Sequence, residues 1–470
     1  MTEMMDSESE SNRSGGDILN SENAGKFSLK AWERYCEEVR SDAARRREVS
    51  ERCMTFGTVS MRYGMKIIGE PDEHGYPVYI ALHGGGNDPG GRVNDQQWRH
   101  MGVYYKDSVK NGIYVNPRGV RDTWDTHANP ESFPLYDRLI ENLAVFYGAD
   151  LNRVYLMGFS AGGDGVYLVG PRMADRFAAL HMSAGHPNHG SLVNLYHTPI
   201  QLQVGMNDFA YNRNQETVRY EQYLDRLQRR DPDGYIHNVY VHVDKPHNFR
   251  DNAAEPQTVL ADNTVWLSCG QVTRRSVDSN AVHFLEQFTR NPLPMRLIWE
   301  LKNRKRAKMR ACESFYWLRV PKEITTGKVI VRLCREENRI VVERDDTQGR
   351  AQVLLNDDML DLDRPVTIVY PEKTRKAGRT ALSAETTGMS RQSARAAEKV
   401  LTSAEATEKI PLPAETTTKD GAEKSGGDAI IRHADITSRT VQCIRSEKMI
   451  LETLRERGDR NFMFSVCIDL

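Results

Sequence analysis

Short apolar runs alternate with amphipathic segments between about residues 57 and 300. The runs are too short for helices and are rich in β-branched and aromatic residues, so they predict buried strands at 78–82, 112–115, 154–157, 178–184, 200–204 and 239–243. The segments 136–147 and 216–227 carry the apolar spacing of helices. Strands and helices in this order predict a mostly parallel sheet buried on both faces, with chemistry at the carboxyl ends of its strands.

The chain before this region divides into two parts. Residues 1–26 are polar and acidic with little to bury, which predicts a disordered tail. The spacing of Leu29, Trp32, Cys36 and Val39 then marks one face of a helix, so we expect residues 27–56 to pack beside the main domain of 57–300.

A second pattern follows residue 313. Segments 314–320, 328–333, 339–343, 351–355 and 365–370 predict strands in close succession, after a basic connector at 301–312. Residues 372–428 are rich in Ala, Thr, Glu, Lys, Ser and Gly, which predicts a disordered low-complexity insertion. Beyond it, 429–432 is strand-like, 436–455 has helical spacing and 462–470 is strand-like. We therefore expect a β-rich C-terminal domain made of residues 313–371 and 429–470.

Composition narrows the classes of partner. The 470 residues carry 64 basic and 65 acidic side chains, a net charge of −1, so no overall field attracts nucleic acid or an anionic membrane. The seven cysteines stand singly, which indicates neither a disulfide framework nor a zinc module. The first residues lack the pattern of a secretory signal, and no window is apolar enough for a membrane span. We expect a cytoplasmic protein with a small-molecule substrate.

The G-x-S-x-G stretch Gly158–Gly162 carries the first chemical signal. It follows the strand at 154–157 and opens a helical run. The glycines on each side of Ser160 suit a sharp strand-to-helix turn that holds its serine in strained dihedrals. Ser160 would then lie at a helix amino terminus, which favours negative charge.

The sequence LHGGG at residues 82–86 complements this serine. An alkoxide that attacks a carbonyl generates an oxyanion, and preorganised backbone N–H groups stabilise it. In turns of the HGGG kind one donor comes from this loop, here Gly85 or Gly86, and the other from the residue after the nucleophile, Ala161. The sequence leaves open which of the two glycines donates.

A base and an orienting acid follow in the chain order that such a fold requires. Asp208 comes after the strand at 200–204, and His247 comes after the strand at 239–243. We expect His247 to take the proton from Ser160 and Asp208 to fix the tautomer of the imidazole.

Four other polar residues are weaker candidates. His186 follows a strand but precedes the acid, so we expect it to line a pocket or anchor a loop. His242 lies within a strand, Asp164 falls in the first helical turn after Ser160, and Asn207 is a turn residue. We expect these three to be structural.

Three aromatic residues, Trp98, Trp124 and Phe159, are candidates to line the substrate pocket. The loop after the strand at 112–115 carries Arg118 and lies at the same edge of the sheet. The basic run KNRKRAKMR is more typical of a solvated junction than of a nucleic-acid site.

The stretch LNRVYLMGFSAGG, with LHGGG upstream and AGHPN downstream, resembles α/β-hydrolases of the polyhydroxybutyrate depolymerase and feruloyl esterase kind over about residues 57–300. The pieces VLLNDDMLDLDRPVTIVY and ETLRERGDRNFMFSVCIDL are similar to the β-rich C-terminal unit of some cytosolic relatives. The resemblance implies an α/β-hydrolase fold and a serine esterase that needs no metal or organic cofactor.

The hypothesis from the sequence is a serine hydrolase that cleaves carboxylic esters through an acyl-enzyme. The same residues would serve a serine peptidase or an acyltransferase, and a hydrolase fold that has lost activity would serve as a scaffold or binding protein. The sequence does not choose among partner binding, substrate gating and structural completion for the β-rich domain.

Overall fold

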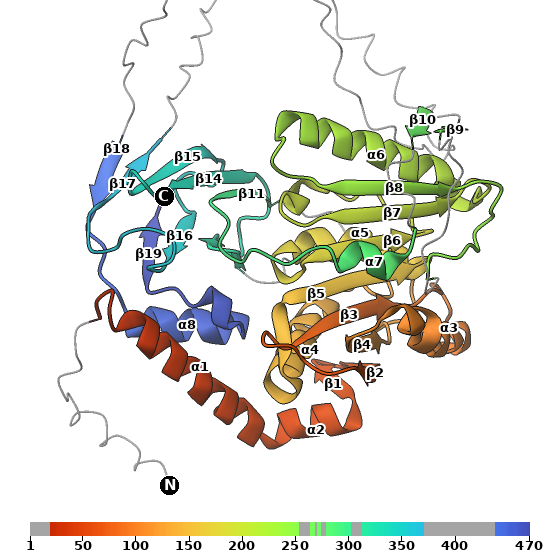
Figure 1. Cartoon of the computed structure of the whole chain (residues 1–470), viewed down its shortest axis with the longest axis horizontal. Helices are drawn as coiled ribbons and strands as arrows, with labels where there is room; N and C mark the ends of the chain where they lie inside the picture. The colour runs from red at the N-terminus through yellow and green to blue at the C-terminus, as the bar shows by residue number, and fades with distance from the viewer. Residues whose placement is uncertain (1–18, 253–263, 268–269, 274–278, 302–312, 371–437) are drawn as a thin grey trace, which may run out of the picture. The chain divides into compact units, whose positions relative to one another are not determined.

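The central sheet holds eight strands in the order β1-β2-β4-β3-β5-β6-β7-β8. The computed structural model describes residues 19–252, 264–267, 270–273, 279–301, 313–370 and 438–470 (Figure 1). The strands of this sheet are β1 (Cys53–Phe56), β2 (Val59–Ile68), β3 (Tyr76–Leu82), β4 (Gly112–Pro117), β5 (Ala149–Phe159), β6 (Ala179–Ser183), β7 (Ile200–Gly205) and β8 (His237–His242). β2 runs antiparallel to both neighbours, and all pairs from β4 to β8 are parallel. This is the strand order of the α/β-hydrolase fold, the fold class that the resemblance in sequence implied.

Helices cover both faces of this sheet, as the continuous apolar strands require. Val78, Ile80 and Leu82 of β3 pack on the side of α4, α5 and α6, whereas Tyr79 and Ala81 pack on the side of α3 and α7. Figure 1 labels these helices together with the strands of the sheet. Their bounds are α3 (Arg92–Tyr104), α4 (Ser132–Tyr147), α5 (Ala161–Val169), α6 (Arg213–Arg230) and α7 (Ala281–Leu285).

The β-rich region forms two further sheets, in the orders β11-β14-β15-β17-β18 and β12-β13-β16-β19. Their strands are β11 (Arg296–Glu300), β12 (Ser314–Phe315), β13 (Leu318–Arg319), β14 (Lys328–Cys334), β15 (Arg339–Asp345), β16 (Gln352–Leu355), β17 (Val366–Val369), β18 (Ser438–Val441) and β19 (Val466–Asp469). The helix α8 (Glu447–Arg457) precedes the last strand. A short separate hairpin pairs β9 (Thr264–Leu267) with β10 (Gly270–Thr273).

One apolar core runs from the central sheet into the β-rich region, because Ile80 and Leu156 belong to the same buried cluster as Trp317 and Phe464. A buried set of charges joins the two regions as well. Asp459 contacts the guanidinium groups of Arg290, at 2.8 Å, and of Arg176, at 3.5 Å. Asp175 and Arg457 form a second pair beside it, at 2.5 Å.

The N-terminal region differs from the single helix expected over 27–56. It forms α1 (Ala24–Ser41), α2 (Ala43–Glu51) and the strand β1. Asp42 breaks the helix, because it is extended and its side chain accepts hydrogen bonds from the first amides of α2. Leu29 was expected on the buried face and is 61% exposed, because Ala31 instead packs against Ile450 and Leu454. The start of α1 also falls inside the tail predicted over 1–26.

Two C-terminal segments differ from their predicted form. Residues 438–441 were expected to be helical and form β18, because they pair antiparallel with β17. The helix begins only at Glu447, and the hydroxyl of its N-cap residue Ser446 accepts from Met449 N. Residues 314–320 were expected to be one strand and form the tight hairpin of β12 and β13, with Tyr316 at φ +51°.

Several predictions concern residues outside the described ranges. These are the tail up to residue 18, the connector at 302–312, the insertion at 372–428 and the strand at 429–432. Within the described part of the chain, no helix combines the length and the apolar character needed to cross a membrane.

Candidate active site

Ser160 lies on a tight turn between β5 and α5. Its backbone has φ +58° and ψ −122°, a conformation that L-residues rarely adopt. The turn leaves no room for side chains beside it: a Cβ on Gly158 would lie 2.3 Å from Gly162 O, and a Cβ on Gly162 would lie 2.0 Å from Leu82 O. The two glycines therefore permit the strained turn that the sequence predicted, with Ser160 at the amino terminus of α5.

His247 and Asp208 come from the connections after β8 and β7 and meet Ser160 at the same edge of the sheet. Nε2 of His247 lies 3.0 Å from Oγ of Ser160, and Nδ1 lies 2.7 Å from Oδ2 of Asp208. Because a carboxylate accepts, Nδ1 carries the proton, and Nε2 is left to accept from the serine hydroxyl. The Asp208 side chain is buried, whereas the His247 side chain is 34% exposed. The structure thus brings together the three residues that the sequence placed far apart.

The second carboxylate oxygen of Asp208 faces Arg213, a residue that the sequence analysis did not single out. Nη1 of Arg213 lies 3.7 Å from Oδ1 of Asp208 and donates to Ala210 O at 3.4 Å. Its guanidinium also lies over the ring of Tyr211, 4.8 Å from the centroid. Arg213 is the first residue of α6, so a helix predicted to begin at 216 left it out.

The oxyanion donors can now be assigned more closely. The Gly86 amide donates to Oδ1 of Asn94 at 2.8 Å, so it is already engaged, and the expectation that Gly86 donates to the oxyanion is not favoured. Among the described residues the structure gives the amides of Gly85 and Ala161 no hydrogen-bond partner. The backbone of the preceding residue, Gly84, lies against Ser160, since a Cβ there would be 3.3 Å from Ser160 Cβ. Gly85 and Ala161 are therefore the candidate pair of donors.

Asn94 holds the glycine loop in place from α3. It is fully buried, and its Nδ2 donates to Gly86 O at 2.9 Å and to Asp122 Oδ1 at 2.7 Å. Asp122 is in turn paired with Arg118. The signal for Asn94 in the sequence is a polar residue seven positions before Met101, on the buried face of the helix.

Two neutral histidines explain why the loop begins with His83. Nε2 of His83 accepts from Gly119 N at 3.0 Å, and Nδ1 donates to Gly84 O at 2.6 Å. Burial lowers the pKa of His83 to about 4, which keeps the ring neutral. His127 donates to His83 O at 2.9 Å, and burial lowers its pKa as well. His83 thus fixes the loop and is not placed to move a proton at Ser160.

The three predicted aromatic residues have different surroundings. The ring of Phe159 stands edge-on to His247, with centroids 5.7 Å apart. Trp124 is 57% exposed and its ring lies against Gly86. Trp98 instead donates from its indole to Asn116 O at 2.9 Å and lies under Arg62, contacts that give it a packing role.

Two exposed aromatic residues were missed. Phe209, 67% exposed, directly follows Asp208. Tyr211, 60% exposed, stands edge-on to Trp124 with centroids 6.1 Å apart. Tyr211 has φ +57° and its neighbour Asn212 has φ +55°, a strained turn that directs the tyrosine ring toward solvent.

The weaker candidates occupy supporting positions. Asp164 accepts from the backbone N–H of His186 at 2.7 Å, and burial raises the pKa of Asp164 to about 6. The His186 ring accepts from Asn188 N at 3.0 Å, which is a loop-anchoring contact. His242 ends β8 and bonds to Gln203 Oε1 at 2.8 Å.

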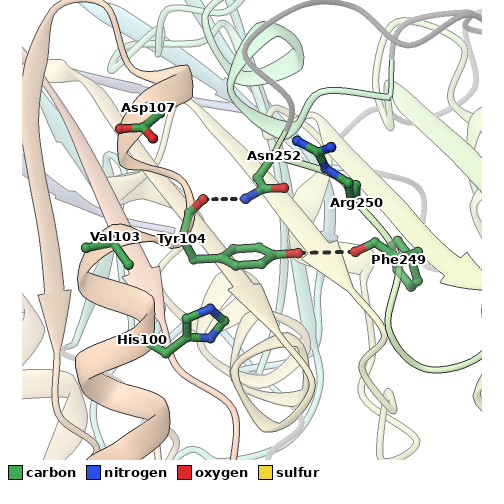
Figure 2. Close-up of a pocket in the computed structure, with 7 residues that line it drawn as sticks. All are labelled: His100, Val103, Tyr104, Asp107, Phe249, Arg250 and Asn252. Carbon is green, nitrogen blue, oxygen red and sulfur yellow. Dashed lines mark hydrogen bonds between the residues drawn. The ribbon is translucent and has the colours of Figure 1, made fainter.

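A pocket of about 480 Å³ lies between α3 and the segment that follows His247. Figure 2 shows Tyr104 at its centre, with its hydroxyl directed at the carbonyl of Phe249. The rings of Tyr104 and Phe249 both pack against the ring of Phe159, with ring centroids 5.6 and 5.4 Å apart. The other lining residues are His100, Val103, Asp107, Arg250 and Asn252. Within the described ranges, no group of three or more His, Cys, Asp or Glu side chains is arranged to hold a metal ion.

The sequence of this chain is similar to that of a known protein over only part of its length. No family model matches the chain. A bifunctional acetylxylan esterase/xylanase, XynS20E of Neocallimastix patriciarum, is 28% identical over 153 residues, which cover 32% of this chain and 22% of that protein. The chain therefore spans about a fifth of the length of this relative.

Solved esterases are similar in structure. Esterase PE8 aligns with a TM-score of 0.29 and 18% identity, over 41% of this chain and 94% of that one. A thermostable esterase aligns with a TM-score of 0.33 and 18% identity, over 51% and 62%. The feruloyl esterase module from Clostridium thermocellum aligns with a TM-score of 0.30 and 14% identity, over 42% and 81%. Because these TM-scores are low, the assignment of the fold rests on the strand order of the central sheet and not on these alignments.

Proposed function

We propose that this protein is a serine hydrolase that cleaves carboxylic esters through an acyl-enzyme intermediate. The observation that carries the proposal is the hydrogen-bonded chain from Asp208 through His247 to Ser160, which ends on a strained serine at a helix amino terminus. Such a chain raises the nucleophilicity of a hydroxyl, and a position with this much backbone strain points to function.

In the proposed reaction Ser160 Oγ attacks the ester carbonyl while Nε2 of His247 takes the hydroxyl proton. The tetrahedral oxyanion accepts hydrogen bonds from Gly85 N and Ala161 N, each worth about 3 kcal/mol. His247 then gives the proton to the leaving alcohol, and the acyl group stays on Ser160. A water molecule, deprotonated by His247, releases the acid and restores the serine. Asp208 stays ionised and stabilises the imidazolium.

The preference for esters is supported by the name of a relative in sequence, a bifunctional acetylxylan esterase/xylanase. The same residues would serve a peptidase or an acyltransferase, which differ only in the bond cleaved or in the acceptor of the acyl group. The resemblance to polyhydroxybutyrate depolymerases adds short 3-hydroxybutyrate esters to the candidate substrates. The proposed compartment is the cytoplasm, supported by the cysteines of the described residues, which are free thiols: Cys36, Cys53, Cys334, Cys443 and Cys467.

A graded substrate panel tests the proposal. Purified protein is assayed with nitrophenyl esters of two to twelve carbons, with 3-hydroxybutyrate oligoesters and with matched peptide anilides, and the products are identified by mass spectrometry. We expect ester hydrolysis that is lost in Ser160→Ala. Faster cleavage of the anilides would favour the peptidase, and acyl transfer to an added alcohol would favour the transferase. No turnover on any substrate would favour a non-catalytic scaffold.

A further inference from the structure

Ser183, the last residue of β6, joins the two halves of the candidate site. Its carbonyl oxygen accepts from the backbone N–H of Ser160 at 2.9 Å. Its hydroxyl donates to the carboxylate of Asp251, which lies four residues after His247. One strand end is thus bonded both to the turn that carries the nucleophile and to the segment that carries the base.

Asp251 has an unusual number of donors for a carboxylate that is fully buried. Oδ1 accepts from the hydroxyl of Tyr104 at 2.8 Å. Oδ2 accepts from Tyr105 at 2.9 Å and lies 3.0 Å from Nε2 of His181, besides accepting from Ser183. These groups come from the end of α3 and from β6. Burial alone would raise the pKa of Asp251, but the hydrogen bonds from His181 and Ser183 hold it below its ordinary value, so the group is ionised.

The stretch that directly follows β8 has little regular structure of its own to place His247. Residues 243–252 contain no helix or strand, and residues 243–246 are exposed. Asp244 has φ +59°, a further sign that the path of the chain is set from outside. At the start of the segment, His242 stacks on Phe249 with centroids 4.2 Å apart. At its end, Asp251 is the buried anchor.

Tyr104 connects this anchor to the wall behind His247. Its hydroxyl lies 3.3 Å from the carbonyl of Phe249, and its own carbonyl accepts from Nδ2 of Asn252 at 2.5 Å (Figure 2). Its ring packs on Phe159, which in turn packs edge-on to His247. Phe249, two positions before Asp251, and Asn252, directly after it, therefore both contact Tyr104.

We propose that Asp251 is a positioning residue that holds the His247 ring in line with the Ser160 hydroxyl. Asp251 does not touch the reacting atoms; it acts through the segment that it anchors and through Ser183. The inference rests on the proposed function, in which a displacement of the base by about 1 Å costs on the order of a hundredfold in rate.

Three variants test the proposal: Asp251→Asn, which keeps the shape and removes the charge, and the milder Ser183→Ala and Tyr104→Phe. The measurements are kcat and KM for a short nitrophenyl ester, corrected for the folded fraction by thermal melting. We expect Asp251→Asn to lower kcat by about a hundredfold with KM nearly unchanged, and the milder variants to lower it less. Ser183→Ala should add little to Asp251→Asn, because the two changes remove one interaction.

The matched controls remove equally buried groups at other places. Tyr79→Phe removes a tyrosine hydroxyl that donates to Glu286 Oε1 at 2.8 Å, and Asp459→Asn removes another fully buried carboxylate. Both are expected to lower thermal stability and to leave kcat per folded molecule unchanged. A loss of kcat in the controls equal to that in Asp251→Asn would overturn the proposal.

A crystal structure of Asp251→Asn separates this inference from the proposed function. The distance from His247 Nε2 to Ser160 Oγ is 3.0 Å in the parent, and we expect it to lengthen by about 1 Å in the variant. A parent without esterase activity would refute the proposed function, while a displaced His247 ring would still support the positioning role. An unmoved ring together with parental kcat in all three variants would refute the positioning role whatever the reaction.

Discussion

Oγ of Ser160 lies 3.0 Å from Nε2 of His247, although 87 positions separate the two residues along the chain. Parallel strands create this proximity, because their carboxyl ends meet at one edge of the sheet. The consequences of the arrangement can be measured one residue at a time.

Asp208→Asn is expected to lower kcat by about a thousandfold or more and to leave the fold intact, because the amide favours the wrong tautomer of His247. Steady-state kinetics with a short ester and a circular dichroism melt give both quantities. Asp225→Asn is the matched control, because Asp225 also contacts a histidine: its Oδ1 lies 3.2 Å from Nε2 of His237. This pair is not part of the contacts around Ser160. Parental kcat in Asp208→Asn would exclude Asp208 as the orienting acid.

Asn94→Ala is expected to lower kcat by about 10- to 100-fold with a smaller change in KM. The substitution removes both hydrogen bonds to Gly86, so the loop that presents Gly85 loses its anchor. Asn142→Ala, which removes a buried asparagine bonded to Arg45, serves as control and should affect stability alone. Equal kcat in the two variants would show that Asn94 does not support the oxyanion site.

Asp164→Asn is expected to gain stability over the parent as the pH rises. The pKa of Asp164 is raised by burial to about 6, above its unfolded value of about 3.9, so ionisation costs the parent stability between about pH 4 and pH 6. Asparagine does not ionise. The difference in free energy of unfolding between variant and parent should therefore grow by about 1 kcal/mol from pH 5 to pH 7.5. A difference that stays constant in urea titrations at the two pH values would contradict the raised pKa.

Asp459→Ala is expected to cost about 3–5 kcal/mol of the free energy of unfolding. Arg290 and Arg176 would keep their buried charges without the carboxylate that joins the central sheet to the β-rich region. Urea unfolding measures the loss. Glu38→Ala, which removes an exposed pair with Arg34, should cost less than about 1 kcal/mol. Similar costs for both variants would show that the junction adds no stability.

The parallel part of the central sheet, from β3 to β8, was predictable from the sequence because strands buried on both faces are continuous apolar runs. The strands β1 and β2 were not predicted, since residues 53–56 were expected to be helical and β2 is buried at alternate positions only. The candidate triad was predictable because strand ends, glycines and chain order all point to the same residues. Ser160, Asp208 and His247 each follow a strand by a few positions, so a correct sheet brings them together.

The remaining differences arise from contacts that local sequence does not contain. In the sequence Gly86 and Gly85 are equivalent candidates. Only the structure distinguishes them, because the amide of Gly86 donates to the side chain of Asn94 in α3. Residues 438–441 form a strand because they pair with the free edge of β17, which lies far away in the sequence. The hydrogen-bond donors to Asp251 come from α3 and β6, and no residue spacing in the sequence predicts that they lie together.

Mass-spectrometric mapping of the adduct formed with a fluorophosphonate tests the central claim most directly. This probe reacts only with an activated serine, so we expect one phosphonylated residue, Ser160, and none at Ser183, although Ser183 also lies 2.9 Å from a histidine nitrogen. Labelling should disappear in Ser160→Ala and in His247→Ala. Folded parent protein that remains unlabelled at Ser160, or labelling that persists in His247→Ala at the parental rate, would contradict the account.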